Sequence, residues 1–270
     1  LNVVTGFGDS TGSPLISHPL IRLVSFTGGV AGGSAAAVSA AQQVKPVIME
    51  LGGKSPQIVF ADADLELAVN GIVAGIFPVS GQTCIAGSRL LVEREIHDEV
   101  VDRLCKIVSP AQLGHPEHAD TQIGPIANEP HFKHILENID NAKSGAAKLV
   151  LGGNAVQPES APNGWFIEPT IFTGVTPDMP LAREEVFGPL LAVLPFDSEE
   201  DAIRLANDSK FGLAAGIWTR DVTRGIRIAD RIGAGTVYIN NYFNATTQSP
   251  VGGYKPVSYT HLTLPTNREV

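Results

Sequence analysis

The stretch PQIVFADADLELAVNGIVAGI, residues 56–76, joins a short apolar run to a longer segment with helical spacing. PQIVF has the length and polarity of a buried strand, and Ile72 and Ile76 lie four residues apart, as on one face of a helix. Asp62 and Asp64 stand between the two, and aspartate often caps a helix N-terminus. The stretch therefore predicts a strand that leads directly into a capped helix.

The same alternation of strand-like and helical stretches runs through most of the chain. Helical stretches such as 97–108 stand between several apolar runs. The further strand-like runs are LNVV (1–4), LIRLVSF (20–26), PVIMEL (46–51), RLLVE (89–93), LLAVLPF (190–196), AAGIW (214–218) and TVYIN (236–240). Stretches 113–130 and 152–164, rich in Gly and Pro, are expected to be surface loops. Alternation of this kind favours an α/β fold with largely parallel sheets.

Composition and charge exclude several classes of protein. The chain has 270 residues, 43% of them apolar, which is enough for a sizeable core. Its 28 acidic and 19 basic residues give a net charge of −9, which repels the phosphates of nucleic acids. No apolar run reaches the roughly 18 residues that span a bilayer, so we expect no membrane segment. Two cysteines make no disulfide framework, and we expect a reducing, cytoplasmic setting.

Two segments of mostly small residues, MELGGKSP (49–56) and GQTCIAGSR (81–89), hold residues suited to covalent catalysis. Cys84 could be a thiol nucleophile, and Glu50 a carboxylate base that activates water. The flanking glycines place Cys84 at an expected helix start, where the helix N-terminus would favour the thiolate. Taken alone, Cys84 could equally be a small core residue, as Cys105 is expected to be, and Glu50 a surface residue.

A glycine-rich turn, FTGGVAGG (26–33), follows the apolar run 20–26 and precedes an alanine-rich helical stretch, 34–43. Such a turn exposes backbone N–H groups and points a helix N-terminus at a bound anion, an arrangement that holds the pyrophosphate of many cofactors. Glycine turns are also common between a strand and a helix that bind nothing. The turn alone therefore leaves cofactor binding open.

Together these motifs resemble those of the aldehyde dehydrogenase family, in register over nearly the whole chain. The resemblance implies an aldehyde dehydrogenase-like α/β fold, with part of a Rossmann-type cofactor domain and an α/β thiol domain. It assigns 1–50 to the dinucleotide-binding domain, 51–240 to the catalytic thiol domain, and 241–255 to the substrate loop and the start of a return segment. The chain would then be a fragment that lacks the N-terminal part of the protein. Residues 256–270 depart from the family pattern and are expected to be a foreign tail.

The resemblance also implies roles for single residues. Cys84 would be the nucleophile and Glu50 the general base. Glu185 would accept hydrogen bonds from the nicotinamide ribose, and Phe187 would pack near the nicotinamide ring. The full set of cofactor-binding residues implied in this way is Gly8, Thr27, Gly28, Gly29, Gly33, Leu51, Glu185 and Phe187. Gly29 stands where the family usually has serine, so a hydroxyl is lost while the backbone donors remain.

By this resemblance the intact enzyme oxidises an aldehyde to a carboxylic acid with NAD or NADP, through a thiohemiacetal and a thioester on Cys84. Glu50 favours release of the acid by water over transfer to coenzyme A. The implied partners are a small aldehyde and further copies of the chain, and residues 241–247 would line the substrate path. Two other interpretations stay open: a thiol hydrolase that needs no cofactor, and an inactive truncated relative.

The histidines predict no metal site. His115 and His118 fall in a proline-containing stretch. His131 and His134 are three residues apart on an expected helix, but no Cys or carboxylate cluster accompanies them. We therefore expect no bound metal.

Overall fold

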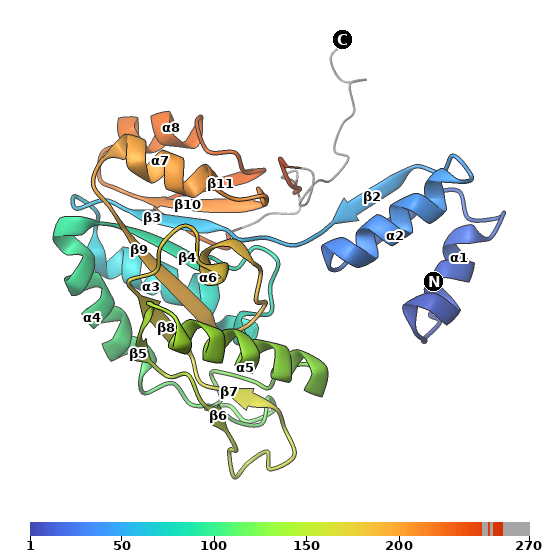
Figure 1. Ribbon diagram of the computed structural model, residues 1–270, viewed down its shortest axis with the longest axis horizontal. Coiled ribbons are helices and arrows are strands. Elements are labelled where there is room, and N and C mark those ends of the chain that lie inside the picture. The colour runs from blue at the N-terminus through green and yellow to red at the C-terminus, as the bar shows by residue number, and fades with distance from the viewer. Residues whose placement is uncertain (245–247, 249–250, 256–270) are drawn as a thin grey trace.

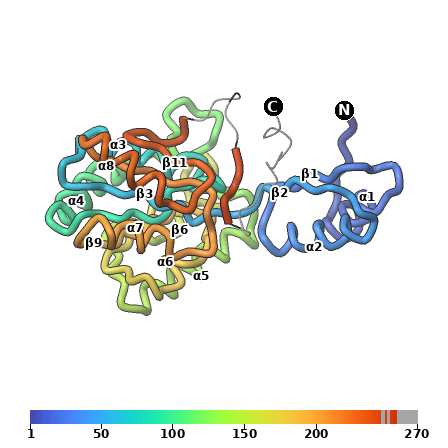
Figure 2. The backbone as a smooth tube through the Cα atoms, turned by 90° about the horizontal axis from the view of Figure 1, so that it is seen from above, coloured from blue at the N-terminus to red at the C-terminus, as the bar shows by residue number. Residues whose placement is uncertain are grey.

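The computed structural model describes residues 1–244, 248 and 251–255. Figure 1 shows a smaller and a larger lobe, joined where the chain leaves β2 (Val47–Glu50) and enters β3 (Pro56–Val59). Seen from above, in Figure 2, the smaller lobe again stands apart from the rest. Residues 51–55, which connect the two strands, are called the inter-lobe segment below.

The larger lobe is built on a seven-stranded sheet with the order β11-β10-β3-β4-β9-β8-β5. Every neighbouring pair of strands in it is parallel except β5 and β8, which are antiparallel. The strands beside β3 are β4 (Arg89–Glu93), β5 (Lys148–Leu151), β8 (Thr170–Thr173), β9 (Leu190–Phe196), β10 (Ala214–Trp218) and β11 (Thr236–Ile239). The prediction of an α/β fold with a largely parallel sheet is confirmed.

Helices cover both faces of this sheet. One face carries α3 (Leu65–Ile76) and α4 (His97–Val108), and the other carries α5 (Glu129–Ser144), α7 (Glu199–Asn207) and α8 (Val222–Ala229). Successive residues of β3 therefore enter different cores: Ile58 packs in the cluster that contains α7, and Val59 in the one that contains α3. Burial on both faces explains why central strands such as β9 are apolar throughout rather than alternating.

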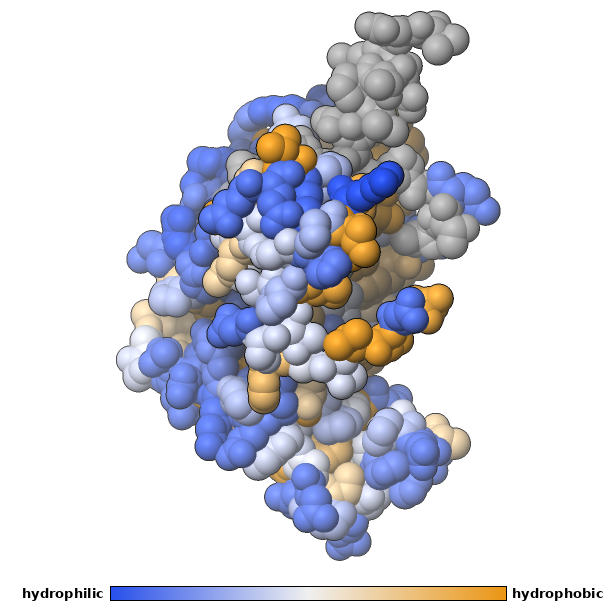
Figure 3. All heavy atoms as spheres, turned by 90° about the vertical axis from the view of Figure 1, so that its right-hand side faces the viewer, coloured by the Kyte–Doolittle hydropathy of each residue, from blue (hydrophilic) through white to orange (hydrophobic). Residues whose placement is uncertain are grey.

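The smaller lobe has a two-stranded parallel sheet and little core. Its elements are a π-helical turn (Gly8–Gly12), α1 (Ser13–Ser17), β1 (Val24–Thr27), α2 (Val30–Ala41) and β2. Only Ala36, Met49 and Leu51 form its buried cluster. Apolar residues therefore remain on its surface, as Figure 3 shows from this side. The predicted strand LNVV is wrong, because residues 1–4 are exposed and pair with no strand of the described chain.

Several short elements were absent from the sequence prediction. The expected loop 152–164 contains β6 (Ala155–Val156), which pairs with β7 (Phe166–Ile167). β5, β8 and the one-turn helix α6 (Pro180–Arg183) were also missed. Elements of two to four residues are too short for their apolar spacing to distinguish a strand from a loop.

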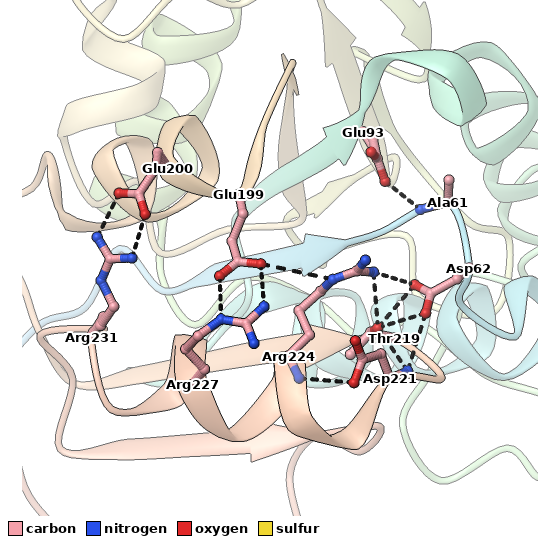
Figure 4. A network of polar contacts seen from close by, with 10 residues as sticks. All are labelled: Ala61, Asp62, Glu93, Glu199, Glu200, Thr219, Asp221, Arg224, Arg227 and Arg231. Atoms are coloured by element: carbon pink, nitrogen blue, oxygen red, sulfur yellow. Dashed lines mark hydrogen bonds and ion pairs between the residues drawn. The ribbon is translucent and has the colours of Figure 1, made fainter.

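A polar network at the end of β3 ties four elements together: β3, β10, α7 and α8 (Figure 4). The Asp62 carboxylate accepts hydrogen bonds from the Thr219 hydroxyl at 2.9 Å and from the Asp221 N–H at 3.1 Å. It also pairs with Arg224 of α8 at 2.9 Å, and the same guanidinium lies 3.9 Å from Glu199 of α7. The network fixes the ends of β3 and β10 to the two helices that cover them.

The helix α3 begins at the cap that the sequence predicts and packs closely on β10. Asp64 Oδ1 accepts a hydrogen bond from the Leu67 N–H at 3.2 Å, and Ile72 is fully buried. Gly71 faces the indole ring of Trp218, and a Cβ built at this glycine would overlap the ring. Glycine in the middle of a helix normally weakens it, so here the close packing must compensate.

Replacing Gly71 with alanine should destabilise the protein, although alanine is the better helix former. Overpacking of this kind costs about 1–3 kcal/mol, against the ~1 kcal/mol that helix propensity returns. We expect Gly71→Ala to lower the free energy of unfolding in urea titrations by up to about 2 kcal/mol. Asn70→Ala is the matched control, because this exposed neighbour gains propensity without adding bulk against Trp218. Equal stability of the two variants would contradict the packing described.

Candidate active site

The inter-lobe segment is buried along its whole length, although it forms neither helix nor strand. Its glycines make this possible. A Cβ at Gly53 would overlap the backbone carbonyl of Cys84, and a Cβ at Gly52 would overlap the carboxylate of Glu185. Because both side chains are absent, the segment lies directly against the turn that carries the cysteine.

Cys84 lies in a tight turn between a short 3-10 helix (Pro78–Gly81) and β4. The Ala86 N–H closes this turn by donating to the Thr83 carbonyl at 3.0 Å. The prediction that Cys84 opens a helix is therefore wrong, because the chain turns here and enters β4. Glycine-flanked small residues suit either conformation, and here the turn is followed by β4, which begins at Arg89.

The Cys84 sulfur is half-buried among groups of opposing effect. Burial raises the pKa of the Cys84 thiol above its usual range, and the negative charges of Glu50 and Glu185 raise it further. The N–H groups of Ile85 and of Cys84 itself face the sulfur, lower the pKa of the thiol and so favour the thiolate. The resting site thus favours the protonated thiol, close enough to both carboxylates to respond to their charge.

The Glu185 carboxylate reaches the inter-lobe segment. Its Oε1 accepts a hydrogen bond from the Gly53 N–H at 2.9 Å. Burial raises the pKa of Glu185, while this hydrogen bond and the Lys54 ammonium lower it. Lys54 is only 2% exposed, and its burial, helped by the Arg89 guanidinium, lowers its pKa to about 7. No role was predicted for Lys54. Its position inside a run of small and apolar residues is the feature that could have indicated its burial.

Phe187 lies close to Glu185 in an unusual backbone conformation. Its φ of +57° falls in the left-handed region, which bulky residues rarely adopt. The Phe187 carbonyl lies 2.7 Å from Nε2 of His131 on α5, and the two rings are 5.9 Å apart. A small hollow at this point is lined by residues from three segments, among them Gly53, Thr83, Ala86, Glu185 and Phe187. His131, which no sequence pattern connected with this site, therefore holds Phe187 in place.

The glycine-rich turn joins β1 to α2 beside the end of β2. The Gly28 N–H donates to the Glu50 carbonyl at 3.0 Å. Gly29 is the N-cap of α2, and a Cβ built there meets nothing within 4 Å. A Cβ at Gly33 would overlap Leu51, so α2 packs tightly on the inter-lobe segment. The structure thus brings the glycine turn, Glu50 and the inter-lobe segment together, with open space at the helix N-terminus.

The other two predicted cofactor residues differ in position. Thr27 pairs with Glu50 at the end of the β1–β2 ladder, next to the glycine turn. Gly8 lies on the exposed surface, in the π-helical turn that packs mainly on α1. The structure therefore groups Thr27 with the remaining candidates and gives no such support to Gly8.

The predicted substrate loop is described only in part, since residues 245–247 lie outside the described residues. Tyr242 is buried, and its hydroxyl donates to the Ile85 carbonyl at 2.7 Å. Its ring centroid lies 5.2 Å from that of Tyr238 and 5.5 Å from that of Phe243. The start of the loop thus contacts the segment that carries the cysteine. The expected foreign tail, 256–270, also lies outside the described part of the chain.

In the described ranges, 1–244, 248 and 251–255, no three His, Cys, Asp or Glu side chains lie together as metal ligands would. His115 and His118 do lie near each other, with ring centroids 5.4 Å apart. No helix in those ranges is long and apolar enough to cross a bilayer.

Fold and site together define an α/β protein in which a half-buried thiol, the end of β2 with Glu50 and a glycine turn before a helix meet at the inter-lobe segment. The model of the aldehyde dehydrogenase family matches residues 1–263. The chain belongs to this family, and the resemblance found in its motifs is confirmed.

Relatives and solved structures agree with this assignment. A betaine aldehyde dehydrogenase of Brucella anthropi is 44% identical over 254 residues, which are 94% of this chain and 52% of that protein. A chloroplastic aminoaldehyde dehydrogenase of Arabidopsis thaliana is 46% identical over 255 residues, 94% of this chain and 50% of that protein. An NAD-dependent aldehyde dehydrogenase from Sinorhizobium meliloti matches with a TM-score of 0.92 at 42% identity, covering 95% of this chain and 50% of that one.

A betaine aldehyde dehydrogenase from Staphylococcus aureus, in complex with NAD+, has a TM-score of 0.91 at 39% identity and covers 94% of this chain and 50% of that one. The chain spans about half the length of the curated relatives it matches. The fold of the part shared with these proteins is therefore established. The division of the chain at residue 50 stays a prediction, although β2 ends at that residue.

The alkylation rate of Cys84 should report the charges around it. In a Cys105→Ser background, we expect the reaction with iodoacetamide to accelerate at a pH above that of a free cysteine, because burial and two carboxylates disfavour the thiolate. Glu50→Gln and Glu185→Gln each remove a negative charge. Both should move the profile to lower pH and raise the rate at neutral pH severalfold.

Glu184→Gln is the matched control for this experiment. Glu184 is exposed and pairs with Lys210 at 2.7 Å, so its charge should leave the thiol unaffected. If the profiles of Glu50→Gln and Glu185→Gln coincided with that of the control, the carboxylates would not act on Cys84, and the site described would be wrong.

Proposed function

We propose that the protein oxidises an aldehyde to a carboxylic acid with NAD or NADP. The observation that carries this proposal is the meeting of three parts at the inter-lobe segment: the turn with Cys84, the strand end with Glu50, and the glycine turn before α2. Membership of the aldehyde dehydrogenase family supports it. NAD is present in the related Staphylococcus aureus structure, which favours the same cofactor here.

The residues around the glycine turn fit a dinucleotide. Gly28 and Gly29 lead into the N-terminus of α2, where backbone N–H groups and the helix dipole attract a pyrophosphate. The open space at Gly29 would admit it. Glu185 and Phe187 would hold the nicotinamide ribose and ring. When bound, the nicotinamide supplies the hydride acceptor, which no protein side chain provides.

Cys84 acts first in this mechanism. Its thiolate forms a bond to the aldehyde carbon, and the carbonyl oxygen takes the negative charge of a thiohemiacetal. The N–H groups of Cys84 and Ile85, which favour the thiolate in the resting site, are suited to stabilise this oxyanion once the sulfur is bonded. Loss of hydride from the same carbon leaves a thioester on Cys84.

Glu50 acts second, as a general base. It takes a proton from water, whose oxygen attacks the thioester carbon and expels the Cys84 thiolate with release of the carboxylic acid. The charge of this carboxylate affects the thiol, which supports a place for Glu50 at the same site. Hydrolysis rather than transfer to coenzyme A follows from the presence of this base.

We further propose a small, nitrogen-bearing aldehyde as the substrate. Relatives that are 44% and 46% identical are named for betaine aldehyde and aminoaldehydes. The half-buried rings of Tyr238 and Phe243 lie near the Cys84 turn, and aromatic faces attract ammonium groups. Assembly into a homo-oligomer and action in the cytoplasm complete the proposal.

A thiol hydrolase without cofactor would need only Cys84 and Glu50. It gives no purpose to the glycine turn before α2, to the strained backbone of Phe187, or to the buried carboxylate of Glu185. An inactive relative would likewise have no need for a nucleophile and a base at one site. Aldehyde oxidation accounts for all of these features together.

Substitution of the two reactive residues separates the steps. In the gene product that carries this chain, Cys84→Ala should lower aldehyde oxidation by at least about 10³-fold, because the covalent step is lost. Glu50→Gln should slow release of the acid by roughly 10²–10⁴-fold with less effect on hydride transfer. Rapid mixing should then show a burst of reduced nicotinamide followed by slow turnover, and mass spectrometry should find the acyl group on Cys84.

Cys105→Ser is the control. Cys105 belongs to α4 and is only partly buried against the core, so it should tolerate the change. Normal turnover in Cys84→Ala would refute the proposed nucleophile. Ester hydrolysis that depends on Cys84, without any oxidation of aldehydes, would favour the thiol hydrolase instead.

A further inference from the structure

Tyr242 is a buried tyrosine that reaches the peptide next to the cysteine. Its hydroxyl, in the loop after β11, donates to the Ile85 carbonyl at 2.7 Å. The Ile85 N–H faces the Cys84 sulfur and lowers the pKa of its thiol. The peptide that follows Cys84 is therefore held at the Ile85 carbonyl by Tyr242.

The Tyr242 ring lies in a slot between two glycines. A Cβ at Gly75 of α3 would lie 2.9 Å from Tyr242 Cδ1, and a Cβ at Gly216 of β10 would lie 2.8 Å from Cδ2. Both distances are shorter than side chains tolerate, so any larger residue at either position would displace the ring. The slot restricts the ring to an orientation that directs its hydroxyl toward Ile85.

The other end of the turn is fixed by contacts of its own. The Gly87 N–H donates to the Gly75 carbonyl at 2.8 Å. A Cβ at Gly87 would overlap Gln57, whose Oε1 accepts a hydrogen bond from Trp218 Nε1 at 3.1 Å. With this end held against α3 and β3, the Tyr242 hydroxyl acts on the half of the turn that carries Cys84.

We propose that Tyr242 is a positioning residue for the nucleophile: by holding the Ile85 carbonyl, it fixes the N–H groups that face the Cys84 sulfur. The same bond links the turn that carries Cys84 to the loop after β11. The inference rests on the proposed function, in which Cys84 is the nucleophile.

The charged groups around the site allow a clean test by pH profile. In addition to burial, Glu50 and Glu185 raise the pKa of Cys84, while Tyr238 and Cys84 raise the pKa of Tyr242. Tyr242→Phe alters none of these neighbours and keeps the ring in its slot. Burial raises the pKa of Tyr242 above its usual range, so in the unsubstituted protein the hydroxyl keeps its proton throughout the assay.

The experiment measures alkylation of Cys84 by iodoacetamide against pH in Tyr242→Phe, with Cys105 replaced by serine in every variant. Without the bond to Ile85, the N–H donors are held less firmly at the sulfur and the thiolate is less favoured. We expect the rate at neutral pH to fall by roughly threefold to tenfold, the equivalent of one hydrogen bond, and the profile to move to higher pH. Tyr254→Phe is the control, because this tyrosine is exposed and its ring lies beside Gly233.

A second pair of variants keeps the hydroxyl. Gly216→Ala should push the ring from its slot and shift the profile in the same direction, whereas Gly124→Ala, where a Cβ meets nothing within 4 Å, should not. Unchanged profiles in both Tyr242→Phe and Gly216→Ala would overturn the proposal. Alkylation requires neither aldehyde nor cofactor, so a shifted profile in a protein that oxidises no aldehyde would refute the proposed function and leave the positioning role standing.

Discussion

The approach of Gly53 to the Cys84 carbonyl is the contact on which the rest of the site depends. Any side chain at this position would collide with the turn and push the inter-lobe segment away from it. Glu50 would then retreat from the thiol, and the Gly53 N–H would lose the Glu185 carboxylate. One missing Cβ thus lets the inter-lobe segment, which follows Glu50, lie against both the turn that carries Cys84 and the Glu185 carboxylate, 132 residues after Gly53.

The electrostatics of the site follow from this close packing. Burial and two carboxylates oppose ionisation of the Cys84 thiol, and burial lowers the pKa of Lys54 to about 7. Peptide N–H groups, rather than a helix N-terminus, provide the opposing stabilisation of the thiolate. Their effect depends on geometry, because a hydrogen bond weakens steeply when its angle changes. Rigid support of the turn by α3, β3 and the loop after β11 is therefore part of the chemistry.

Sequence patterns predicted most of what depends on local order. The strand and helix in 56–76, the helix 97–108 and the strands β4, β9 and β10 formed as their apolar spacing indicated. The motifs also indicated Cys84 and Glu50, which the structure brings near each other. What the patterns missed depends on contacts between distant segments. The turn at Cys84, the role of His131 and the anchor at Tyr242 arise from tertiary packing, and no periodicity encodes them.

The most direct test is a crystal structure of the protein with Cys84 alkylated by iodoacetamide, whose amide carbonyl stands in for that of the thioester. The account predicts that this carbonyl lies in the hollow lined by Gly53 and Glu185, with its oxygen on backbone N–H groups of the turn. The Glu50 carboxylate should then stand one water molecule away from the carbonyl carbon. An adduct directed into bulk solvent, with Glu50 on the opposite side of the inter-lobe segment, would contradict it.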